Sequence, residues 1–435
     1  MIEYCSNRFK QLGTWAKCFW IVYFITVCLP LHASNNFLAW VTIGGSYTYM
    51  HLLLLLLLVG ACIRRYGDAR LTPSNLLCMV FILFQVIALV GNSSGVHDAL
   101  SDFGRYLLSI LFLILARTKR FGMVNLRFFL YLSAMAMFVN CCINLFMNIT
   151  RWSVWGLLYF NFDNRTGGGY YNLLVFLVPL ALYSLLNERG GVHFPFFFAF
   201  AIISFVCMLY AKSRTLMILT LIGCTVVVLV TLLDLRSEKS GLHLLEGIFI
   251  IVLTGLGIHI FLYSDNDVAR HIMTATGSLT DNSDTLYTRI LTAQYYVQQM
   301  IEHPLGKGFG AQMMKFSDAG VWDYASVAYE IDNAPLTFGY HAGVFGFIVY
   351  ILILLSPFVG IIRIKDASKG FKIVVATSYG LILVATALLT SQCIHNYPVV
   401  AFIWTFVGLN LDGTSISAGK EFASAGACEI SKYAV

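Results

Sequence analysis

The chain of 435 residues is 58% hydrophobic and only 11% charged, and its mean hydropathy is +0.77. A soluble domain carries about 25% charged residues, so these values exclude a soluble enzyme and a disordered or collagen-like chain. We therefore expect a polytopic membrane protein of the all-α class. The net charge of +6 does not indicate nucleic-acid binding, because the basic residues lie in short loops between apolar runs.

Apolar runs separated by polar or charged turns predict about twelve transmembrane helices. Most Lys and Arg fall on one side of the membrane if both termini are cytoplasmic, and this sets the predicted orientation. We expect residues 1–411 to form a single transmembrane domain and residues 412–435 to be a flexible cytoplasmic tail. The predicted spans are 16–34, 41–62, 76–92, 103–116, 126–147, 170–187, 194–211, 215–234, 241–263, 334–356, 372–390 and 397–411.

Two polar loops, 148–169 and 264–332, lie on the outer side of this predicted topology. The longer loop contains a capping pair, Ser283 and Asp284, which predicts a helix that starts at Thr285. We expect that helix to be amphipathic and to lie on the bundle or the membrane surface. Its predicted apolar face consists of Leu286, Ile290, Ala293, Val297 and Met300, and His303-Pro304 ends it.

Several basic residues on the outer side are not needed to set topology. Arg214 begins a span just after Lys212 and is either an interfacial anchor or a cation that faces a phosphate. Arg289 lies in the loop helix, where it is either on a solvated face or part of the same phosphate site. With Arg165 and Arg270, these side chains form a pattern that suits an anionic lipid headgroup or a pyrophosphate.

Two carboxylates come just before the tenth predicted span. Glu330 and Asp332 are either solvated loop acids or, at the mouth of the bundle, candidates for a general base. A carboxylate partly shielded from water there could take a proton from a hydroxyl group. The alternatives stay open at this point.

The sequence predicts neither a metal nor a nucleotide cofactor. His243, His259, His341 and His395 are scattered without the spacing of metal ligands. The glycine-rich run at 306–310 lacks the G-K-[ST] ending of a nucleotide loop and the strand that precedes one. We expect this run to be a turn-rich exit from the loop helix.

Four short motifs in chain order resemble the bacterial O-antigen polymerase (Wzy-type) and O-antigen ligase superfamily. They are Arg165-Thr-Gly-Gly-Gly-Tyr-Tyr-Asn172, Ser213-Arg214-Thr215, Arg289 with its helix and the run from His303 to Gly310, and Asp332-Asn333 followed by Gly343 and Gly346. The last is similar to a ligase pattern of His-Asn/Ser/Gln, nine residues, Gly, two residues, Gly. Asp332 stands where that pattern has His, which favours a polymerase over a ligase.

The resemblance implies a glycosyltransferase that joins undecaprenyl-pyrophosphate-linked oligosaccharides into a polysaccharide at the periplasmic face of the inner membrane. In this scheme Asp332 accepts the proton of the attacking hydroxyl, while Arg214 and Arg289 stabilise the departing undecaprenyl pyrophosphate. The leaving group is already activated, so no nucleotide or metal is needed. The implied substrate-binding residues are Arg270, Arg165, Asn333, Glu330 and Lys212.

The implied partners are the lipid-linked oligosaccharides, membrane lipid and a co-polymerase that regulates chain length. One alternative is an O-antigen ligase-type transferase, which moves finished glycan onto lipid A-core. Another is a transporter of polysaccharide or lipid-linked sugar. Transporters place charges or broken helices at mid-membrane, whereas the predicted spans are nearly free of charge, and this favours chemistry at the surface.

Overall fold

The computed structural model describes residues 2–28, 49–63, 72–91, 95–118, 126–150, 170–187, 194–210, 214–234, 285–316, 322–324, 331, 333–364, 367–388 and 397–411. The elements are α1 (Ile2–Gln11), α2 (Thr14–Cys28), α3 (Tyr49–Ile63), α4 (Pro73–Val90), α5 (Val96–Arg117), α6 (Leu126–Thr150), the 3-10 helix η2 (Tyr170–Leu173), α7 (Leu174–Asn187), α8 (Phe194–Tyr210), α9 (Arg214–Asp234), α12 (Thr285–Glu302), β1 (Met314–Phe316), β2 (Trp322–Tyr324), α13 (Ala334–Arg363), α14 (Lys369–Leu388) and α16 (Tyr397–Asn410).

Every predicted span except 241–263, which lies outside the described residues, coincides with a helix. Six of these helices are long and apolar enough to cross a membrane, and the shorter apolar helices have 10–17 residues. The helical membrane architecture is thus confirmed. The total of twelve spans, the cytoplasmic termini and the single domain over 1–411 stay predictions, and the tail 412–435 lies outside the described residues.

Exposed apolar side chains mark helix faces that suit a lipid environment. On α4, Leu76, Met79, Leu83 and Val90 are 55%, 58%, 54% and 78% exposed. They recur every three, four or seven residues and therefore share one face of the helix. A contiguous apolar face of this kind is costly in water but costs nothing against lipid tails.

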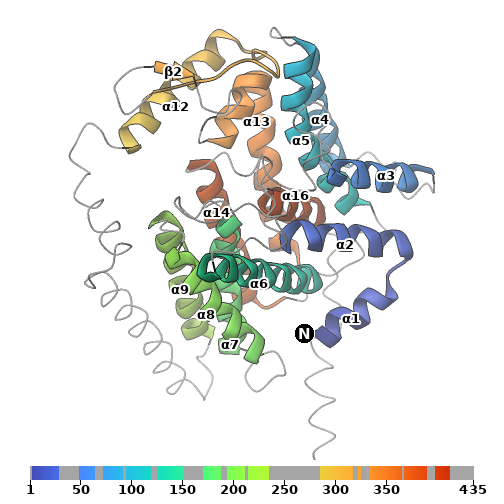
Figure 1. Ribbon diagram of the computed structural model, residues 1–435, viewed down its shortest axis with the longest axis vertical. Coiled ribbons are helices and arrows are strands. Elements are labelled where there is room, and N and C mark those ends of the chain that lie inside the picture. The colour runs from blue at the N-terminus through green and yellow to red at the C-terminus, as the bar shows by residue number, and fades with distance from the viewer. Residues whose placement is uncertain are drawn as a thin grey trace, which may run out of the picture.

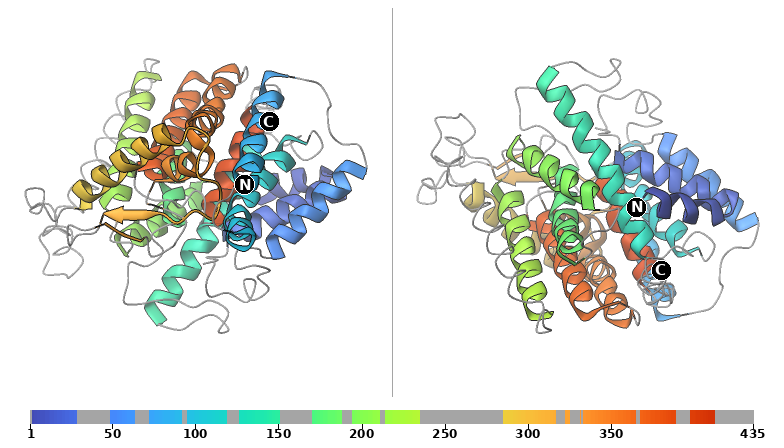
Figure 2. Two further views of the ribbon diagram at one scale, coloured as in Figure 1. Left: turned by 90° about the horizontal axis from the view of Figure 1, so that it is seen from above. Right: turned by 90° about the horizontal axis from the view of Figure 1, so that it is seen from below.

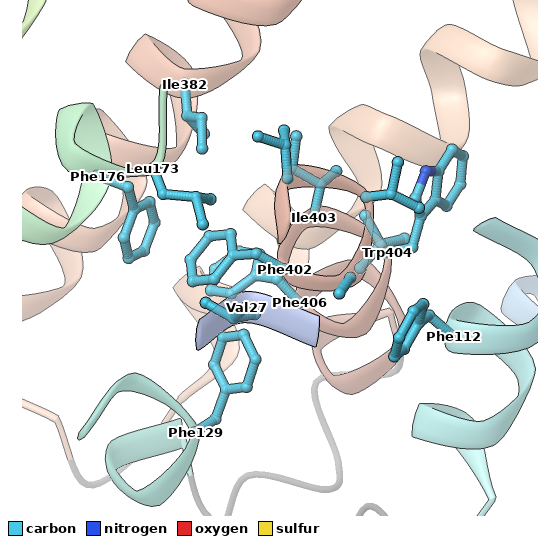
Figure 3. Packing of buried hydrophobic residues seen from close by; sticks show 14 of the residues in the cluster. Val27, Phe112, Phe129, Leu173, Phe176, Ile382, Phe402, Ile403, Trp404 and Phe406 are labelled. Carbon is cyan, nitrogen blue, oxygen red and sulfur yellow. The ribbon is translucent and has the colours of Figure 1, made fainter. Parts of the chain in front are cut away.

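The core is built around α16, whose residues are buried from end to end. A helix that is apolar all round belongs at the centre of a bundle, and α16 packs against α2, α5 and α13. Phe402 and Phe406 meet Phe129 of α6 and Phe176 of α7, while Trp404 lies on the other side of the helix (Figure 3). A second group, α7, α9 and α14, packs beside this core.

Two elements were not predicted from the sequence. The helix α1 precedes the first span. It contacts α6 through a cation–π interaction, in which the guanidinium carbon of Arg127 lies 5.7 Å from the ring centroid of Tyr4. The strands β1 and β2 pair antiparallel, with Lys315 opposite Asp323. The outer loop therefore contains a short hairpin beside its helix, which refines the all-α prediction.

The helix α12 begins at Thr285, as predicted, and ends at Glu302, just before His303. The proposed caps Ser283 and Asp284 lie outside the described residues. Figure 1 shows α12 and β2 at the same end of the molecule as the start of α13 and the start of α5. Seen along the other axis, α12 lies on the opposite side of the bundle from α1–α3 (Figure 2).

The predicted apolar face of α12 is only partly correct. Met300 of that face packs against the protein, whereas Ile290 and Val297 are 48% and 45% exposed and are left for the membrane surface. The buried face also carries Thr292 and Tyr296. Tyr296 faces inward because its hydroxyl group makes hydrogen bonds to the backbone of Met314. The spacing of apolar residues does not reveal such bonds.

Candidate functional site

The helix α13 is broken at Gly343. This residue has φ 76° and ψ −179°, a backbone conformation that only glycine adopts readily. A Cβ atom at Gly343 would collide with the carbonyl oxygen of Pro304. The sequence analysis expected a continuous span over 334–356, so the break corrects that prediction.

The glycine loop, residues 306–310, fits into this break. The backbone N–H of Lys307 donates to the carbonyl of Tyr340 at 2.9 Å, and that of Gly308 donates to the carbonyl of His341 at 3.0 Å. These carbonyls belong to the last turn before the break and would otherwise lack helical partners. Buried backbone in a membrane protein must be satisfied by protein in this way.

Further contacts lock the glycine loop on both sides. On the far side of the break, Val344 N–H donates to the carbonyl of Pro304 at 3.1 Å, and Phe309 N–H donates to the carbonyl of Ala88 in α4 at 2.8 Å. The Phe309 ring is fully buried and stacks on Tyr106 of α5 at 4.9 Å between centroids. The glycine run is therefore the turn-rich exit expected from the sequence, and it also inserts into the bundle.

A buried ion pair fastens the same junction to α5. His341 Nε2 lies 3.2 Å from Asp102 Oδ2, and the two side chains are 0% and 1% exposed. His341 Nδ1 lies 2.8 Å from the carbonyl of Gly308, and the N–H of Gly310 donates to Asp102 Oδ2 at 3.3 Å. Both imidazole nitrogens are thus engaged by buried protein groups.

The sequence analysis missed this pair. In the sequence His341 is one of several scattered histidines, and no motif points to Asp102. The rule that an ionisable residue inside a membrane span deserves a functional or structural explanation would have flagged His341. Arg105 lies one turn beyond Asp102 on α5 and acts on its carboxylate electrostatically.

This pair and the broken helix weaken the argument against a transporter, which rests on spans that are nearly free of charge. Both features lie toward one end of the bundle, however. Gly343 comes nine residues into the 30-residue α13, which is about 14 Å along a helix about 45 Å long. A mid-membrane position, as in transporters, would call for a break closer to the middle.

A small second core joins α12 to the first part of α13. The rings of Tyr296 and Tyr340 meet edge to face at 5.0 Å between centroids. The Tyr296 hydroxyl donates to the carbonyl of Met314 and accepts from its N–H, each at 2.6 Å. Burial raises the pKa of Tyr296 above its ordinary value, so this hydroxyl stays protonated and neutral near pH 7.

Arg289 lies on the inner side of α12. At about 100° per residue, its side chain is within about 20° of those of Tyr296 and Met300 around the helix axis. Tyr296 is fully buried and Met300 is 5% exposed, whereas Arg289 is half-buried. The interpretation of Arg289 as part of a solvated helix face is therefore disfavoured.

Asn333 has a structural role that the sequence analysis did not assign. It caps α13, because its Oδ1 accepts a hydrogen bond from Leu336 N–H at 3.0 Å. This cap fixes the backbone just after Asp332. The loss of an Asn cap costs about 1 kcal/mol of stability.

The remaining predicted site residues are not placed by the structure. Arg214 begins α9, but only its backbone is described. The others lie outside the described residues: Asp332, Glu330, Arg270, Arg165 and Lys212. Within the described ranges, no group of three His, Cys, Asp or Glu side chains could hold a metal ion.

The described elements define a helical membrane protein in which α12, the glycine loop and the start of α13 meet at one end of the bundle. Residues 199–351 match the family model described as O-antigen ligase (Wzy_C). This stretch is just over a third of the 435 residues. It runs from α8 into α13 and contains Arg289, the glycine loop and His341. The predicted resemblance to the O-antigen polymerase and ligase superfamily is thereby confirmed, and no curated protein matches the chain.

Proposed function

We propose that the chain is an O-antigen polymerase, which joins repeat units carried on undecaprenyl pyrophosphate at the periplasmic face of the inner membrane. The observation that carries the proposal is the convergence of α12, the glycine loop and the capped start of α13 within a region that matches the O-antigen ligase family. Asn333, the next residue after the proposed base Asp332, thus lies at the same end of the bundle as α12, the helix of Arg289.

The chemistry needs one base and one anion site. A non-reducing hydroxyl of the acceptor attacks the anomeric carbon of the donor's reducing-end sugar, and a new glycosidic C–O bond forms. The bond from that carbon to the pyrophosphate oxygen breaks, and the hydroxyl proton passes to the carboxylate of Asp332. Undecaprenyl pyrophosphate leaves with the electron pair, and Arg289 and Arg214 stabilise its negative charge.

Two features support assigning these roles to the named residues. Asp332 directly precedes in sequence Asn333, the N-cap of α13. Arg289 lies on the inward side of α12 and presents an always-charged, bidentate group suited to phosphate oxygens. Arg270, Arg165, Glu330 and Lys212 remain proposed substrate contacts.

The departure from the ligase pattern favours the polymerase over its relatives. Asp332 stands where a ligase has His, and a carboxylate can serve as the base for a sugar hydroxyl. A ligase-type transferase remains the second candidate, because the matched family model carries the ligase description. A transporter is the third candidate, and the broken α13 is the observation that favours it.

The direct test is a gel of surface lipopolysaccharide and lipid-linked glycan from a host that lacks the gene. The strain is complemented with the wild type, Arg289→Ala, Asp332→Asn or the control Arg363→Ala, an exposed residue at the far end of α13. We expect the ladder to shrink to core plus one repeat unit, and only the wild type and Arg363→Ala to restore it.

The other outcomes identify the alternatives. Long glycan that accumulates on the carrier lipid and never reaches the core would make the protein a ligase. Single repeat units trapped on the inner leaflet would make it a transporter. Full polymerisation by both Arg289→Ala and Asp332→Asn would remove these residues from the site.

A further inference from the structure

The backbone of Lys307 is fixed by its two neighbouring glycines and by a hydrogen bond to α13. It lies between Gly306 and Gly308, whose φ angles of 80° and 79° are in the left-handed region. Its N–H donates to the carbonyl of Tyr340 at the break in α13. A cation on such a backbone is placed before any ligand arrives, which lowers the entropic cost of binding.

The side chain of Lys307 is held by neutral groups. Its Nζ donates to Oε1 of Gln299 on α12 at 2.5 Å and lies 5.3 Å from the centroid of the Tyr340 ring. In the described part of the chain, these contacts include no carboxylate. The ammonium is half-buried and offers three N–H donors, so Gln299 leaves donors for a ligand.

The nearest acid on α12 is engaged elsewhere. Glu302 accepts hydrogen bonds from Gln298 Nε2 at 2.8 Å and from Gln299 Nε2 at 2.9 Å. Gln299 therefore stands between the carboxylate and the ammonium, donating to Glu302 and accepting from Lys307. An amide in this position keeps the two charges apart, and the positive charge of Lys307 remains available to an anion.

We propose that Lys307 is an anion-binding residue of the site and contacts a phosphate oxygen of a lipid-linked pyrophosphate. The proposal rests on the proposed function and adds a cation that the predicted site residues did not include. Among the described residues no carboxylate contacts the Lys307 ammonium, and an anion that takes its remaining donors stabilises it. Lysine binds phosphate as a point charge and so tolerates changes in the approach of the ligand.

The rival explanation is purely mechanical. In that case Lys307 has only a structural role: its hydrogen bond to Gln299 holds the glycine loop against α12. The two roles depend on different features. A structural role needs the hydrogen bond to Gln299, whereas an anion site needs the positive charge at position 307. Variants at these two positions therefore separate them.

The experiment measures binding to the purified full chain in nanodiscs of neutral lipid. The probes are farnesyl pyrophosphate, inorganic pyrophosphate and farnesol, and a second set of nanodiscs contains phosphatidylglycerol as an anionic competitor. The variants are Lys307→Gln, Lys307→Arg and Gln299→Ala. The matched control is Lys17→Gln, because Lys17 is also half-buried and lies 6.0 Å from an aromatic ring, that of Phe9, outside the site.

We expect Lys307→Gln to weaken farnesyl pyrophosphate binding about tenfold, which is about 1.4 kcal/mol, with an unchanged Tm. Lys307→Arg and Lys17→Gln should bind within about twofold of the wild type, and Gln299→Ala within about threefold. Farnesol binding should not depend on residue 307. If phosphatidylglycerol competes for the site as strongly as farnesyl pyrophosphate does, membrane headgroups are the natural anion. Binding of inorganic pyrophosphate measures whether the site takes the anion without a lipid chain.

Three results would overturn the proposal. The first is that Lys307→Gln and the wild type bind with equal affinity. The second is that Gln299→Ala loses binding as completely as Lys307→Gln does. The third is that the wild type does not bind pyrophosphate. The surface-glycan ladder separates this failure from failure of the proposed function. A Lys307→Gln strain with a full ladder would remove Lys307 from the site while the polymerase assignment stands.

Discussion

The two parts of α13 belong to one helix but have opposite surroundings. Every residue from Ala334 to Ala342 is buried by protein. After the break at Gly343, exposed apolar side chains recur every three or four residues, and they are Phe345, Ile348, Leu352, Leu355, Val359 and Ile362. The first part is therefore a packed structural element, and the second part presents a stripe that suits lipid.

Helix length explains the division. The whole of α13 has 30 residues and is about 45 Å long, which exceeds a hydrocarbon core of about 30 Å. The part after Gly343 is about 20 residues and about 30 Å long, so it can cross the core alone. The first part then stands beyond the hydrocarbon, where α12 and the glycine loop cover it. The difference teaches that the break separates a helix part packed by protein from a part with a lipid-suited stripe.

The largest effect is expected from closing the break. Gly343→Ala places a Cβ atom against the Pro304 carbonyl and forces a backbone conformation that L-residues avoid, so we expect little folded protein. Size-exclusion chromatography of detergent-extracted protein measures the folded fraction. Gly380→Ala in α14 is the control, since its Cβ would meet only Phe358 Cζ at 3.6 Å. A monodisperse Gly343→Ala protein with the wild-type Tm would contradict the account.

The next effect concerns the buried pair that holds the first part of α13. Asp102→Ala leaves His341 buried without its carboxylate, and the free energy of unfolding should fall by about 3–5 kcal/mol. Asp98→Ala, one turn earlier on α5, removes a carboxylate that is 43% exposed and should change stability by less than about 0.5 kcal/mol. Denaturation in detergent measures both. Equal stability of the two variants would show that the pair does not fasten the junction.

The smallest effect on stability is expected in the second part of α13. There, one of two neighbouring residues faces the protein and the other faces the lipid. Ile353 is fully buried and Leu352 is 50% exposed. Ile353→Ala should cost about 2–4 kcal/mol because it leaves a cavity, and Leu352→Ala should cost less than about 1 kcal/mol. The same denaturation measurement compares them. A larger loss for Leu352→Ala would mean that the stripe packs against protein instead of lipid.

The sequence predicts the parts of this molecule that depend on local pattern. Apolar runs of sufficient length located the helices, and the turn signals around Thr285 and His303 located α12. These features follow from hydrophobic burial and capping within a few turns, so a single chain segment contains them. The prediction failed for the packed face of α12, where Tyr296 takes the inward position through hydrogen bonds to Met314.

The junction itself could not be read from the sequence. It joins Asp102 on α5, Ala88 on α4 and the glycine loop to the break at Gly343. Residues so distant in the chain leave no periodic signal when they meet. The positive φ angles of Gly306 and Gly308 are compatible with many turns. The glycine spacing therefore indicates an unusual backbone conformation, but it does not indicate that this loop packs against the break in α13.

The central claim is that the site at the outer end of α13 joins lipid-linked glycans. The most direct measurement is reconstitution of the purified chain in liposomes with polyprenyl-pyrophosphate-linked repeat units and no other protein. The account predicts lipid-linked glycans of two or more repeat units, with one polyprenyl pyrophosphate released for each bond formed. Unchanged single repeat units, in the presence of folded wild-type protein and intact donor, would contradict it.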